Sequence, residues 1–450
     1  MNPTDNPTEN PISRRRFLAG ATAALAFSGC IDPRARVADS TPTTTPSPNR
    51  GGRSAVPGFE VGISVYAWDL HDEGIERVLD NLQMAAVNNV YLLGLMHPEK
   101  RPATTAVFPH NPLRQTWTAE DSRVYWHPDM TRYGRIKPRL SDHDWLNQTD
   151  WVAELVTAVR KRGLSTGVEI SHSIVDRQRA EGELADCAQR DIHGNISHNH
   201  FRPACINNPD VRVYVLALFR ELAERYDVDL IMSAIIPFDE GGPATGGCFC
   251  PSCHKQAEQD GFDLAAAQAA LLVNPAAEPH LSRWRQFRFA STARLYGTIH
   301  ETVHATRRNR SNVDLRFSLF MTKRNPADWG VDLPMMRQAV DSIRVQEYSE
   351  DTGNAAALAV KRQYLIQIAR ELGREVPATP AGGAISSAGF PINSAVGVRP
   401  RATPELIKAG IAICRGCGMS GITLSQYDGA DFTLLKAVRD GLAAAQLLRM

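Results

Sequence analysis

An alternation of short apolar strands with longer amphipathic helices constrains this sequence most, and it runs from Phe59 almost to the end of the chain. Eight segments have the apolar, β-branched composition of strands, with helical patterns between them: 60–66, 90–95, 165–171, 229–236, 314–321, 342–348, 376–381 and 421–427. Leu230, Ile231 and Met232 make both faces of one strand apolar, as in sheets covered on both sides. Eight β-then-α units in one series predict a closed parallel (β/α)8 barrel, the TIM-barrel architecture.

An open doubly wound sheet is the alternative α/β architecture. It would normally carry a glycine-rich phosphate-binding turn after its first strand, whereas residues 66–69 read Tyr-Ala-Trp-Asp. We therefore expect one barrel domain over residues 58–450. Its longest loop, about 96–147, follows the second strand. Because the loops after the strands build the functional site of a barrel, this loop is expected to face the substrate.

The N-terminus carries an export pattern. Residues 13–18 read Ser-Arg-Arg-Arg-Phe-Leu, and an uncharged run of small residues follows, too short for a permanent membrane span. Residues 1–30 resemble a twin-arginine signal peptide, which implies export after folding by the twin-arginine machinery and a periplasmic or cell-surface location. Residues 27–30 read Phe-Ser-Gly-Cys and resemble a bacterial lipoprotein cleavage box, with Phe where Leu is usual, which implies lipidation of Cys30.

A stretch of low complexity follows the signal. Residues 31–57 are rich in Pro and Thr and poor in side chains that could be buried, so they predict a disordered linker. The formal net charge of the whole chain is +1, which gives no basic surplus for binding nucleic acid. No later apolar run reaches membrane-spanning length, so contact with a membrane is expected only through the signal or a lipid anchor.

Three cysteines lie close together directly after the fourth predicted strand. Cys248, Cys250 and Cys253 form a C-x-C-x-x-C pattern, whose tight spacing lets three thiolates converge on one metal ion. A tetrahedral site needs a fourth ligand, and Cys205 upstream fits. Disulfides and free thiols are the alternatives, since an oxidising compartment permits disulfides; folding in the reducing cytoplasm before export favours metal loading.

The surroundings of these cysteines match a known pattern. Residues 205–209 read C-x-N-x-P, and a helix, a strand, the pair Asp239-Glu240 and the C-x-C-x-x-C pattern follow. This arrangement, over about residues 202–253, resembles the central part of family 42 β-galactosidases and is similar to related families of hypothetical glycosyl hydrolases. The resemblance implies an oligo- or polysaccharide substrate, no organic cofactor, and a structural zinc ion on the four cysteines.

Hydrolysis of a glycosidic bond needs two carboxyl groups, one protonated and one ionised. Glu240 stands at the C-terminal end of the fourth predicted strand, where a barrel carries its chemistry, and the resemblance to clan A glycosidases implies that it is the acid/base. Asp239 replaces the Asn that usually precedes that Glu. A second carboxyl beside Glu240 would raise the proton affinity of the pair or take part in the reaction itself.

The partner carboxylate does not follow from the family pattern. Clan A places its nucleophilic Glu at the end of the seventh strand, and residues 377–383 contain no carboxylate here. Glu347, at the end of the sixth predicted strand, is the partner that we expect. Glu169 on the third strand and Asp428 on the eighth are substitutes that we expect to contact the substrate. The other interpretation of each is a salt-bridged carboxylate at the barrel rim.

Aromatic residues end several predicted strands. Tyr66 and Trp68 close the first strand, Tyr348 the sixth and Tyr427 the eighth. Aromatic faces at a barrel mouth can stack on the C–H faces of sugars, so these four are candidate substrate-binding residues. Packing at the rim is the alternative.

Two other functions stay open. The missing carboxylate at the seventh strand favours a non-catalytic barrel that binds glycans or serves as a cell-surface scaffold. A metal-dependent hydrolase would use His198 and His200 as ligands, with His172 and His193 nearby. That pattern belongs at the end of the first strand, whereas most of these histidines stand in a Gly- and Asn-rich loop, so we favour the glycosidase.

Overall fold

The computed structural model describes residues 58–96, 99–101, 109–114, 117–119, 122–174, 177–197, 203–239, 246–306, 313–320, 325–376 and 389–448. They belong to one compact unit, Ser47–Met450. The predicted signal with Cys30 and the whole predicted linker lie outside the described residues. So do Glu240, His198 and His200.

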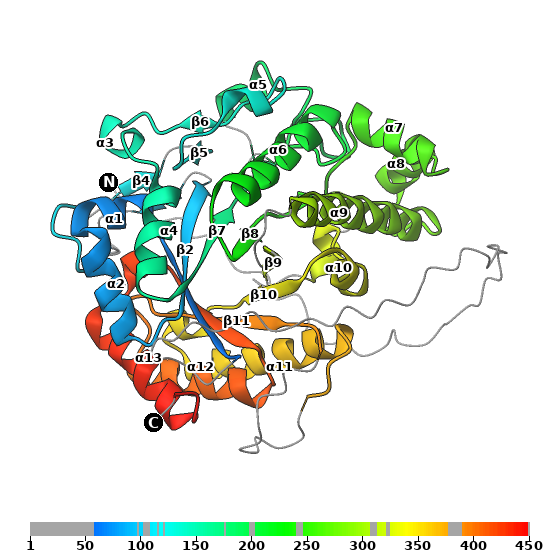
Figure 1. Ribbon diagram of the computed structural model, residues 1–450. Coiled ribbons are helices and arrows are strands. Elements are labelled where there is room, and N and C mark those ends of the chain that lie inside the picture. Colours follow the sequence, from blue (N-terminus) through cyan, green and yellow to red (C-terminus); the bar gives the residue numbers. More distant parts are fainter. Residues whose placement is uncertain are drawn as a thin grey trace, which may run out of the picture. The chain divides into compact units, whose positions relative to one another are not determined.

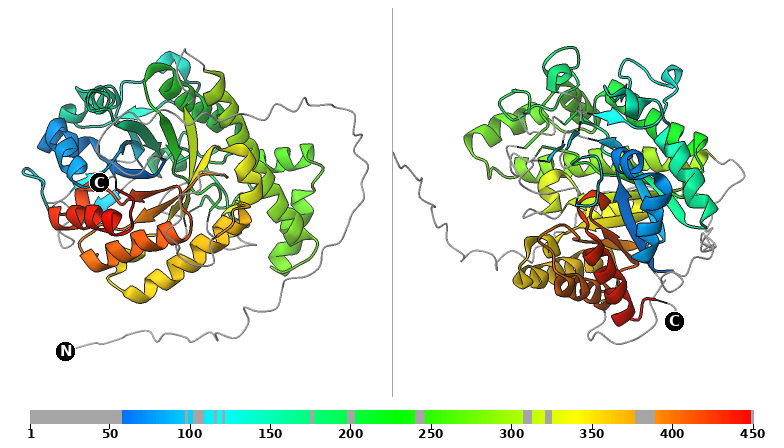
Figure 2. Two further views of the ribbon diagram at one scale, coloured as in Figure 1. Left: turned by 60° about the horizontal axis from the view of Figure 1, so that its bottom comes forward. Right: turned by 90° about the vertical axis from the view of Figure 1, so that its left-hand side faces the viewer.

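Eight parallel strands close into a barrel (Figures 1 and 2). Each strand pairs in parallel with the next, and β1 pairs with both β12 and β2, which removes any free edge. The predicted TIM barrel is therefore confirmed. In chain order its strands are β1 (Glu60–Val65), β2 (Asn89–Met96), β7 (Ser165–Ile170), β8 (Leu230–Ser233), β9 (Asp314–Phe320), β10 (Ser342–Gln346), β11 (Ile392–Val396) and β12 (Gly421–Leu424).

The seventh strand was placed wrongly by the sequence pattern. The prediction was 376–381, but the strand between β10 and β12 is β11, Ile392–Val396. Two polar residues, Asn393 and Ser394, interrupt its apolar pattern, and both are buried in the barrel wall. A strand whose polar side chains are buried lacks the apolar run that identifies a covered strand in a sequence.

Helices surround the barrel (Figure 2). Side-chain caps fix where several begin: Asp150, Asn208 and Asp431 each accept a backbone hydrogen bond from the first turn of the helix that follows. The helices are α1 (Ala67–Glu73), α2 (Ile75–Met84), α3 (Asp144–Asn147), α4 (Trp151–Lys161), α5 (Arg177–Glu181), α6 (Pro209–Arg225), α7 (Pro251–Gln259), α8 (Leu264–Val273), α9 (His280–Ala305), α10 (Leu333–Ala339), α11 (Ala355–Glu371), α12 (Pro404–Gly416) and α13 (Phe432–Ala444).

The long loop after β2 contains short elements of its own. It carries β3 (Glu99–Arg101), β4 (Trp117–Ala119), β5 (Arg123–Val124) and β6 (Arg139–Leu140), and β5 pairs antiparallel with the end of β2. The pairing ties this loop to the C-terminal edge of the barrel, the edge at which TIM barrels carry their functional sites. Among the described helices, none is both long and apolar enough to cross a membrane.

The barrel interior is polar and contains two arginine–glutamate pairs. Arg316 on β9 donates to both carboxylate oxygens of Glu60 on β1, each at 2.7 Å, and Arg344 on β10 donates to both oxygens of Glu169 on β7, at 2.5 and 3.1 Å. Each of the two arginines also donates to a serine on the strand that carries the other arginine. Arg316 Nε donates to Ser342 on β10, and Arg344 Nε donates to Ser318 on β9, both at 2.9 Å.

A third ion pair is completely buried outside the barrel wall. Lys361 on α11 donates to Glu350 and to the carbonyl oxygen of Ala395, both at 2.6 Å, and both charged side chains are 0% exposed. Glu350 also accepts from the backbone N–H of Gly397 at 2.9 Å. Gly410 on α12 leaves room for this carboxylate, because a Cβ there would overlap it. The pair thus joins α11, α12 and the end of β11.

We expect Arg344→Met to lower the free energy of unfolding by about 3–5 kcal/mol, since it leaves the Glu169 carboxylate charged and buried without its cation. Arg220→Met, at an exposed position on α6, should change it by less than about 0.5 kcal/mol. Urea unfolding at neutral pH measures both. The double variant Glu169→Leu/Arg344→Met should recover part of the loss. Equal, small effects of Arg344→Met and Arg220→Met would contradict the role given to this pair.

Candidate functional site

The C-terminal ends of the parallel strands bring most of the candidate residues to one face of the barrel. Asp239 follows β8, Glu347 and Tyr348 follow β10, and Tyr427 follows β12. This is the face on which TIM barrels carry their functional sites. The contacts of each side chain decide which of them can act there.

Glu169 lies at the base of this mouth. It is 5% exposed, it is held by both terminal nitrogens of Arg344, and its Oε2 also accepts a 2.7 Å hydrogen bond from Ser64 on β1. Glu169 is therefore one half of an ion pair at the base of the mouth, and both of its oxygens are occupied by donors from the protein.

Glu347 comes directly after β10 and is half-buried. Its Oε1 accepts a 2.7 Å hydrogen bond from Ser349, whose hydroxyl also contacts the carbonyl oxygen of Ala357 on α11. Because Arg344 and Gln346 point into the barrel, alternation along the strand puts Glu347 on the α11 side of the mouth. Burial raises the pKa of its carboxyl above the usual value, which favours the protonated form that an acid catalyst needs.

Tyr348 is next to Glu347 and is also half-buried. Burial raises the pKa of its phenol, and two charges act on it as well: that of Arg344 lowers the pKa and that of Glu169 raises it. Tyr348 is thus a neutral hydroxyl near Arg344 and Glu169, and it can donate a hydrogen bond to a ligand.

Asp239 is held in place at the end of the segment that follows β8. Its backbone N–H donates to Gln189 Oε1 at 2.9 Å, and its Oδ2 accepts from Ser197. Gln189 is itself 0% exposed and donates to the carbonyl oxygens of Pro237, at 2.7 Å, and of Ala204, at 3.2 Å. One buried glutamine therefore fixes the position of the carboxylate that immediately precedes Glu240.

The other aromatic candidates are buried. Tyr66 and Trp68 stack on each other with ring centroids 4.1 Å apart, and they are 0% and 1% exposed. Tyr427 is 0% exposed and donates to Glu73 at 2.9 Å while accepting from Asn81 at 2.8 Å. These contacts give all three residues a packing role, and stacking on a sugar stays a prediction for each.

A buried histidine lies beside Tyr427. His110 Nδ1 is 2.6 Å from Glu73 Oε1, and its Nε2 is 3.0 Å from the Tyr427 carbonyl oxygen. The pKa of His110 is raised although burial lowers it, because the hydrogen bond and charge of Glu73 and the charge of Asp428 outweigh that effect. Asp428 is itself 0% exposed. This group ties η5 (Tyr427–Gly429) to α1 and α2 beside the barrel.

His172 follows β7 but behaves as a core residue. It is 0% exposed, its Nδ1 lies 2.8 Å from Ser173 Oγ, and its Nε2 lies 2.7 Å from Ser233 Oγ. Burial lowers its pKa to about 3, so the imidazole is neutral at physiological pH. His193 is exposed in its loop. Neither of the two described histidines shares a metal-ligand cluster with other described residues, so the metal-dependent hydrolase gains no support from them.

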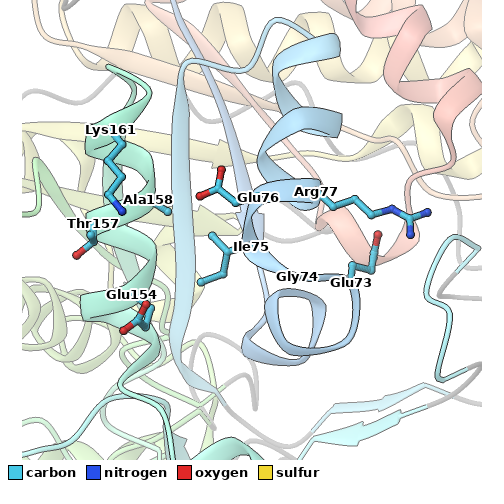
Figure 3. A pocket seen from close by; sticks show the side chains of 9 residues that line it. All are labelled: Glu73, Gly74, Ile75, Glu76, Arg77, Glu154, Thr157, Ala158 and Lys161. Atoms are coloured by element: carbon cyan, nitrogen blue, oxygen red, sulfur yellow. The ribbon is translucent and has the colours of Figure 1, made fainter.

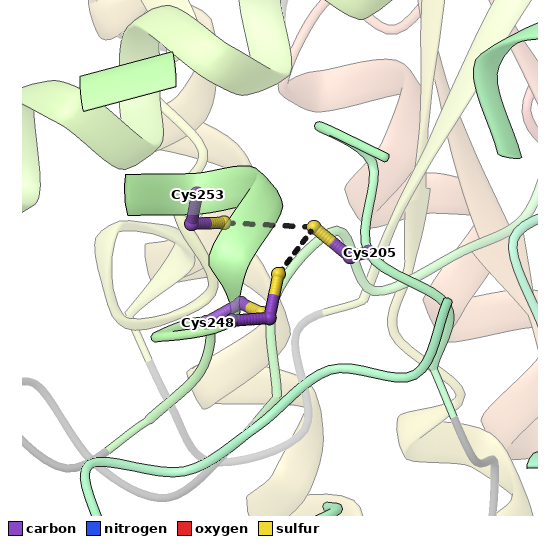
Figure 4. Close-up of side chains that lie close together, drawn as sticks. Cys205, Cys248 and Cys253 are labelled. Carbon is purple, nitrogen blue, oxygen red and sulfur yellow. Dashed lines mark hydrogen bonds between the residues drawn. The ribbon is translucent and has the colours of Figure 1, made fainter. Parts of the chain in front are cut away.

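Four buried cysteines form a cluster beside α7 (Figure 4). Cys205 Sγ lies 3.5 Å from Cys253 Sγ and 3.3 Å from Cys250 Sγ, and the sulfurs of all four, including Cys248, are within 4.8 Å of one another. A disulfide would join sulfurs at about 2.05 Å, so these are free thiols. Tetrahedral thiolate ligation separates sulfurs by roughly 3.8 Å for metal–sulfur bonds of about 2.3 Å. The cluster can therefore hold a metal ion.

The surroundings of the cluster also suit thiolates. The backbone N–H of Arg190 donates to Cys248 Sγ, and the side-chain amide of Asn207 donates to Cys253 Sγ, both at 3.4 Å. Hydrogen bonds from Cys205 and its neighbours hold the pKa of Cys250 far below its usual value, while burial raises the pKa of Cys253. Four thiolates in this buried site would need a cation, because an uncompensated buried charge is costly.

The cysteine cluster and the end of β8 share one support. Gln189 precedes Arg190, whose N–H contacts Cys248, and the same Gln189 holds Asp239. A Cβ on Gly247 would lie 2.8 Å from Gln189 Oε1, so only glycine lets the cysteine-bearing loop approach this closely. The segment that carries Gly247 and Cys248 therefore packs directly against Gln189 and Arg190.

Sequence reasoning missed the residues that hold the candidates in place. An arginine in the middle of an apolar strand, as at Arg316 and Arg344, signals a buried carboxylate partner, since a buried guanidinium is almost never unpaired. The pattern thus contained a signal for an ion-paired interior, although it could not tell which glutamates were involved. For Gln189 no local signal exists.

One hollow lies away from the mouth of the barrel. It has a volume of about 500 Å³ and lies between α2 and α4 on the outer wall of the barrel, lined among others by Glu73, Ile75, Glu154 and Lys161 (Figure 3). None of its lining residues comes from the C-terminal end of a barrel strand. We therefore place the candidate site at the mouth.

No protein-family model matches the sequence, and no curated protein matches it. Solved structures do resemble the fold. The PgaB (BpsB) glycoside hydrolase domain from Bordetella bronchiseptica has 13% sequence identity and a TM-score of 0.57, and the match covers 87% of this chain and 99% of that domain. This chain is therefore similar in fold, over nearly its whole described length, to a glycoside hydrolase domain.

Two β-galactosidases give similar results. The enzyme from the haloarchaeon Halorubrum lacusprofundi has 11% identity and a TM-score of 0.55, covering 87% of this chain and 58% of that one. Gan42B, a GH42 β-galactosidase from G. stearothermophilus, has 11% identity and a TM-score of 0.51, covering 88% and 59%. At such identities the likeness shows the fold: a glycoside hydrolase-like (β/α)8 barrel that spans little more than half the length of these β-galactosidases.

The buried, neutral state of His172 predicts a pH dependence. Its pKa is about 3 in the folded chain against 6.5 as the ordinary value, so between these values the unfolded chain binds the extra proton. The contribution of His172 to the free energy of unfolding is therefore complete above pH 6.5. It is lost as the pH falls below that value, by about 1.4 kcal/mol per pH unit. His172→Gln should remove this part of the slope of unfolding free energy against pH.

Chemical unfolding at several pH values between 4 and 7 measures the two slopes. His193→Gln, at an exposed loop position, is the matched control and should keep the slope of the parent. A slope unchanged by His172→Gln would show that this imidazole is not held neutral.

Proposed function

We propose that the chain is an exported glycoside hydrolase that cleaves glycosidic bonds of an oligo- or polysaccharide, with Glu240 as the general acid/base. The observation that carries the proposal is the fixed position of Asp239 at the end of the segment after β8, where buried Gln189 holds its backbone. Glu240 is the next residue in the sequence, and the fold of the barrel is similar to that of glycoside hydrolases. Glycan hydrolysis is the activity that those names suggest.

Glu347 is the partner carboxylate in this proposal, and Glu169 contributes to substrate binding. The raised pKa of Glu347 and its place after β10 support a group that takes up or releases a proton near the substrate. Glu169, held by Arg344 and Ser64, would accept hydrogen bonds from sugar hydroxyls with its remaining lone pairs. Tyr348, which follows Glu347 in the sequence, would donate a hydrogen bond to the glycan.

A barrel that binds glycans without cleaving them is the second candidate. β11 ends at Val396, and Gly397, Val398 and Arg399 follow, so the corrected seventh strand is not followed by a carboxylate either. Both carboxylate oxygens of Glu169 are engaged, by Arg344 and Ser64. This observation favours a binding site that uses charge and hydroxyl groups for recognition.

Two further features belong to the same proposal. The N-terminal pattern over residues 1–30 would direct the folded protein through the twin-arginine machinery, with a lipid on Cys30 holding it at the cell surface. A zinc ion on the four cysteines would hold the segment after Cys205 to the loop that leads into α7. Zinc fits because four thiolates in tetrahedral array are its preferred structural ligands.

We expect Glu240→Gln to lower kcat on aryl glycosides by about 10²- to 10⁴-fold, since it removes the proton that assists the leaving group. The free energy of unfolding should stay within about 0.5 kcal/mol of the parent. The measurement is turnover of a panel of aryl glycosides by the full chain. Glu258→Gln, at an exposed position on α7, is the matched control and should keep full activity.

The variants Glu347→Gln and Glu169→Gln then distinguish the contributions of these two carboxylates to turnover. Loss of turnover in a stably folded Glu347→Gln protein supports the assigned partner. Undiminished turnover by Glu240→Gln would refute the acid/base assignment. Absence of turnover on every substrate, together with saturable binding of an oligosaccharide by calorimetry, would favour the glycan-binding barrel.

For the cysteine cluster we expect one zinc ion per chain by elemental analysis, lost in Cys205→Ser. The same change should lower the free energy of unfolding by about 4 kcal/mol or more, the size typical of a lost structural metal. Cys414→Ser is the matched control, because Cys414 is equally buried but lies in α12 outside the cluster. An unchanged zinc content in Cys205→Ser would contradict the four-cysteine site.

A further inference from the structure

Three possible metal-ligating side chains meet at the opposite end of the barrel from the mouth. His300 and His304 lie one turn apart near the C-terminal end of α9, and Asp341 immediately precedes β10. Because Asp341 stands before its strand, the group lies at the N-terminal face of the barrel, away from the proposed catalytic residues. It is also separate in sequence from the cysteine cluster.

The three side chains converge. His300 Nε2 lies 3.1 Å from Asp341 Oδ1, and His304 Nε2 lies 2.9 Å from Asp341 Oδ2. The ring centroids of the two histidines are 4.1 Å apart, and one ligand atom from each of the three residues lies within 4.8 Å of the others. Ligand atoms around a tetrahedral zinc ion, with bonds of about 2.0–2.1 Å, are roughly 3.4 Å apart. Small side-chain movements would therefore admit an ion.

The carboxylate of this group is fixed and its surroundings are negative. Asp341 Oδ2 accepts a 2.7 Å hydrogen bond from the backbone N–H of Leu315 on β9. Asp314, the first residue of β9, places a second carboxylate close enough for its charge to act on both Asp341 and His304. A dication would relieve the repulsion between the two carboxylates.

The exposure of the group leaves room for further ligands. The side chains of His300, His304 and Asp341 are 33%, 22% and 26% exposed, so solvent reaches the ligand atoms. Three protein ligands with water in the remaining positions form a coordination set common for divalent transition metals in proteins. Two imidazoles select Zn²⁺, Ni²⁺ or Cu²⁺ over Mg²⁺ and Ca²⁺, which prefer oxygen ligands.

We propose that His300, His304 and Asp341 form a second metal site, which binds a divalent transition-metal ion such as Zn²⁺ with water completing its coordination. Nothing in the proposed glycosidase activity requires this site. Its physical effect is to fasten the last two turns of α9, a helix of 26 residues, to the start of β10. Metal binding at this place stabilises the folded chain, because the ion joins elements that are not adjacent in sequence.

The test uses the full chain after dialysis against a weak chelator, with zinc content measured before titration. Zn²⁺ titrated into this protein by calorimetry should bind at one site in addition to any metal already held by the cysteines. The double variant His300→Ala/His304→Ala should lose that binding or weaken it at least 10-fold. His280→Ala, which removes a histidine from the first turn of the same helix, should bind as the parent does.

Co²⁺ distinguishes the two sites, because ligation by thiolates gives intense sulfur-to-metal charge-transfer absorption and ligation by imidazole and carboxylate does not. The expected spectrum of the added Co²⁺ lacks that absorption. If the double variant folds poorly, the parent protein provides a second test. Zn²⁺ should protect His300 and His304 of the parent from modification by diethyl pyrocarbonate, as measured by peptide mass spectrometry. No added binding in the parent, equal binding by the double variant, or unprotected histidines would overturn the proposal.

Discussion

The pairing of two arginines with two glutamates inside the barrel is the interaction on which the rest of the structure depends. Each charge, taken alone out of water, would cost several kcal/mol, and its partner and hydrogen bonds must offset that cost. Glu60 and Arg316 come from β1 and β9, and Glu169 and Arg344 from β7 and β10. These strands are not neighbours around the barrel, so the pairs exist only when the barrel is closed. Closure and charge compensation are therefore one event.

This polar interior determines what the mouth can do. Because Arg344 holds Glu169 by two hydrogen bonds, a fixed ion pair lies at the base of the candidate site. A barrel filled by Leu and Ile would give the same shape without this ion pair. The buried Lys361–Glu350 pair extends the principle outward, since it fixes the turn after β10 against α11 and the end of β11.

The cysteine cluster supports the mouth from the other side. Cys205 and the C-x-C-x-x-C segment bracket the end of β8, and Gln189 contacts both the backbone of Asp239 and the segment that precedes Cys205. A metal ion bound there would stabilise the segment that carries Cys248 and Cys250. Through Gln189 and its neighbour Arg190 it would also support the position of Asp239, without touching the substrate.

The sequence by itself determined the barrel, because strand and helix patterns are local and repeat through the chain. It also grouped Cys248, Cys250 and Cys253, because close spacing brings thiols together, and it placed Glu347 at a strand end. Asp239, in contrast, follows β8 only after a connecting segment. The tertiary structure alone decided that β11 is the seventh strand, that Glu169 is paired with Arg344, and that Tyr427 turns toward Glu73 and Asn81. Each of these depends on which side of a strand faces inward and on partners far away in the sequence, and no local pattern encodes either.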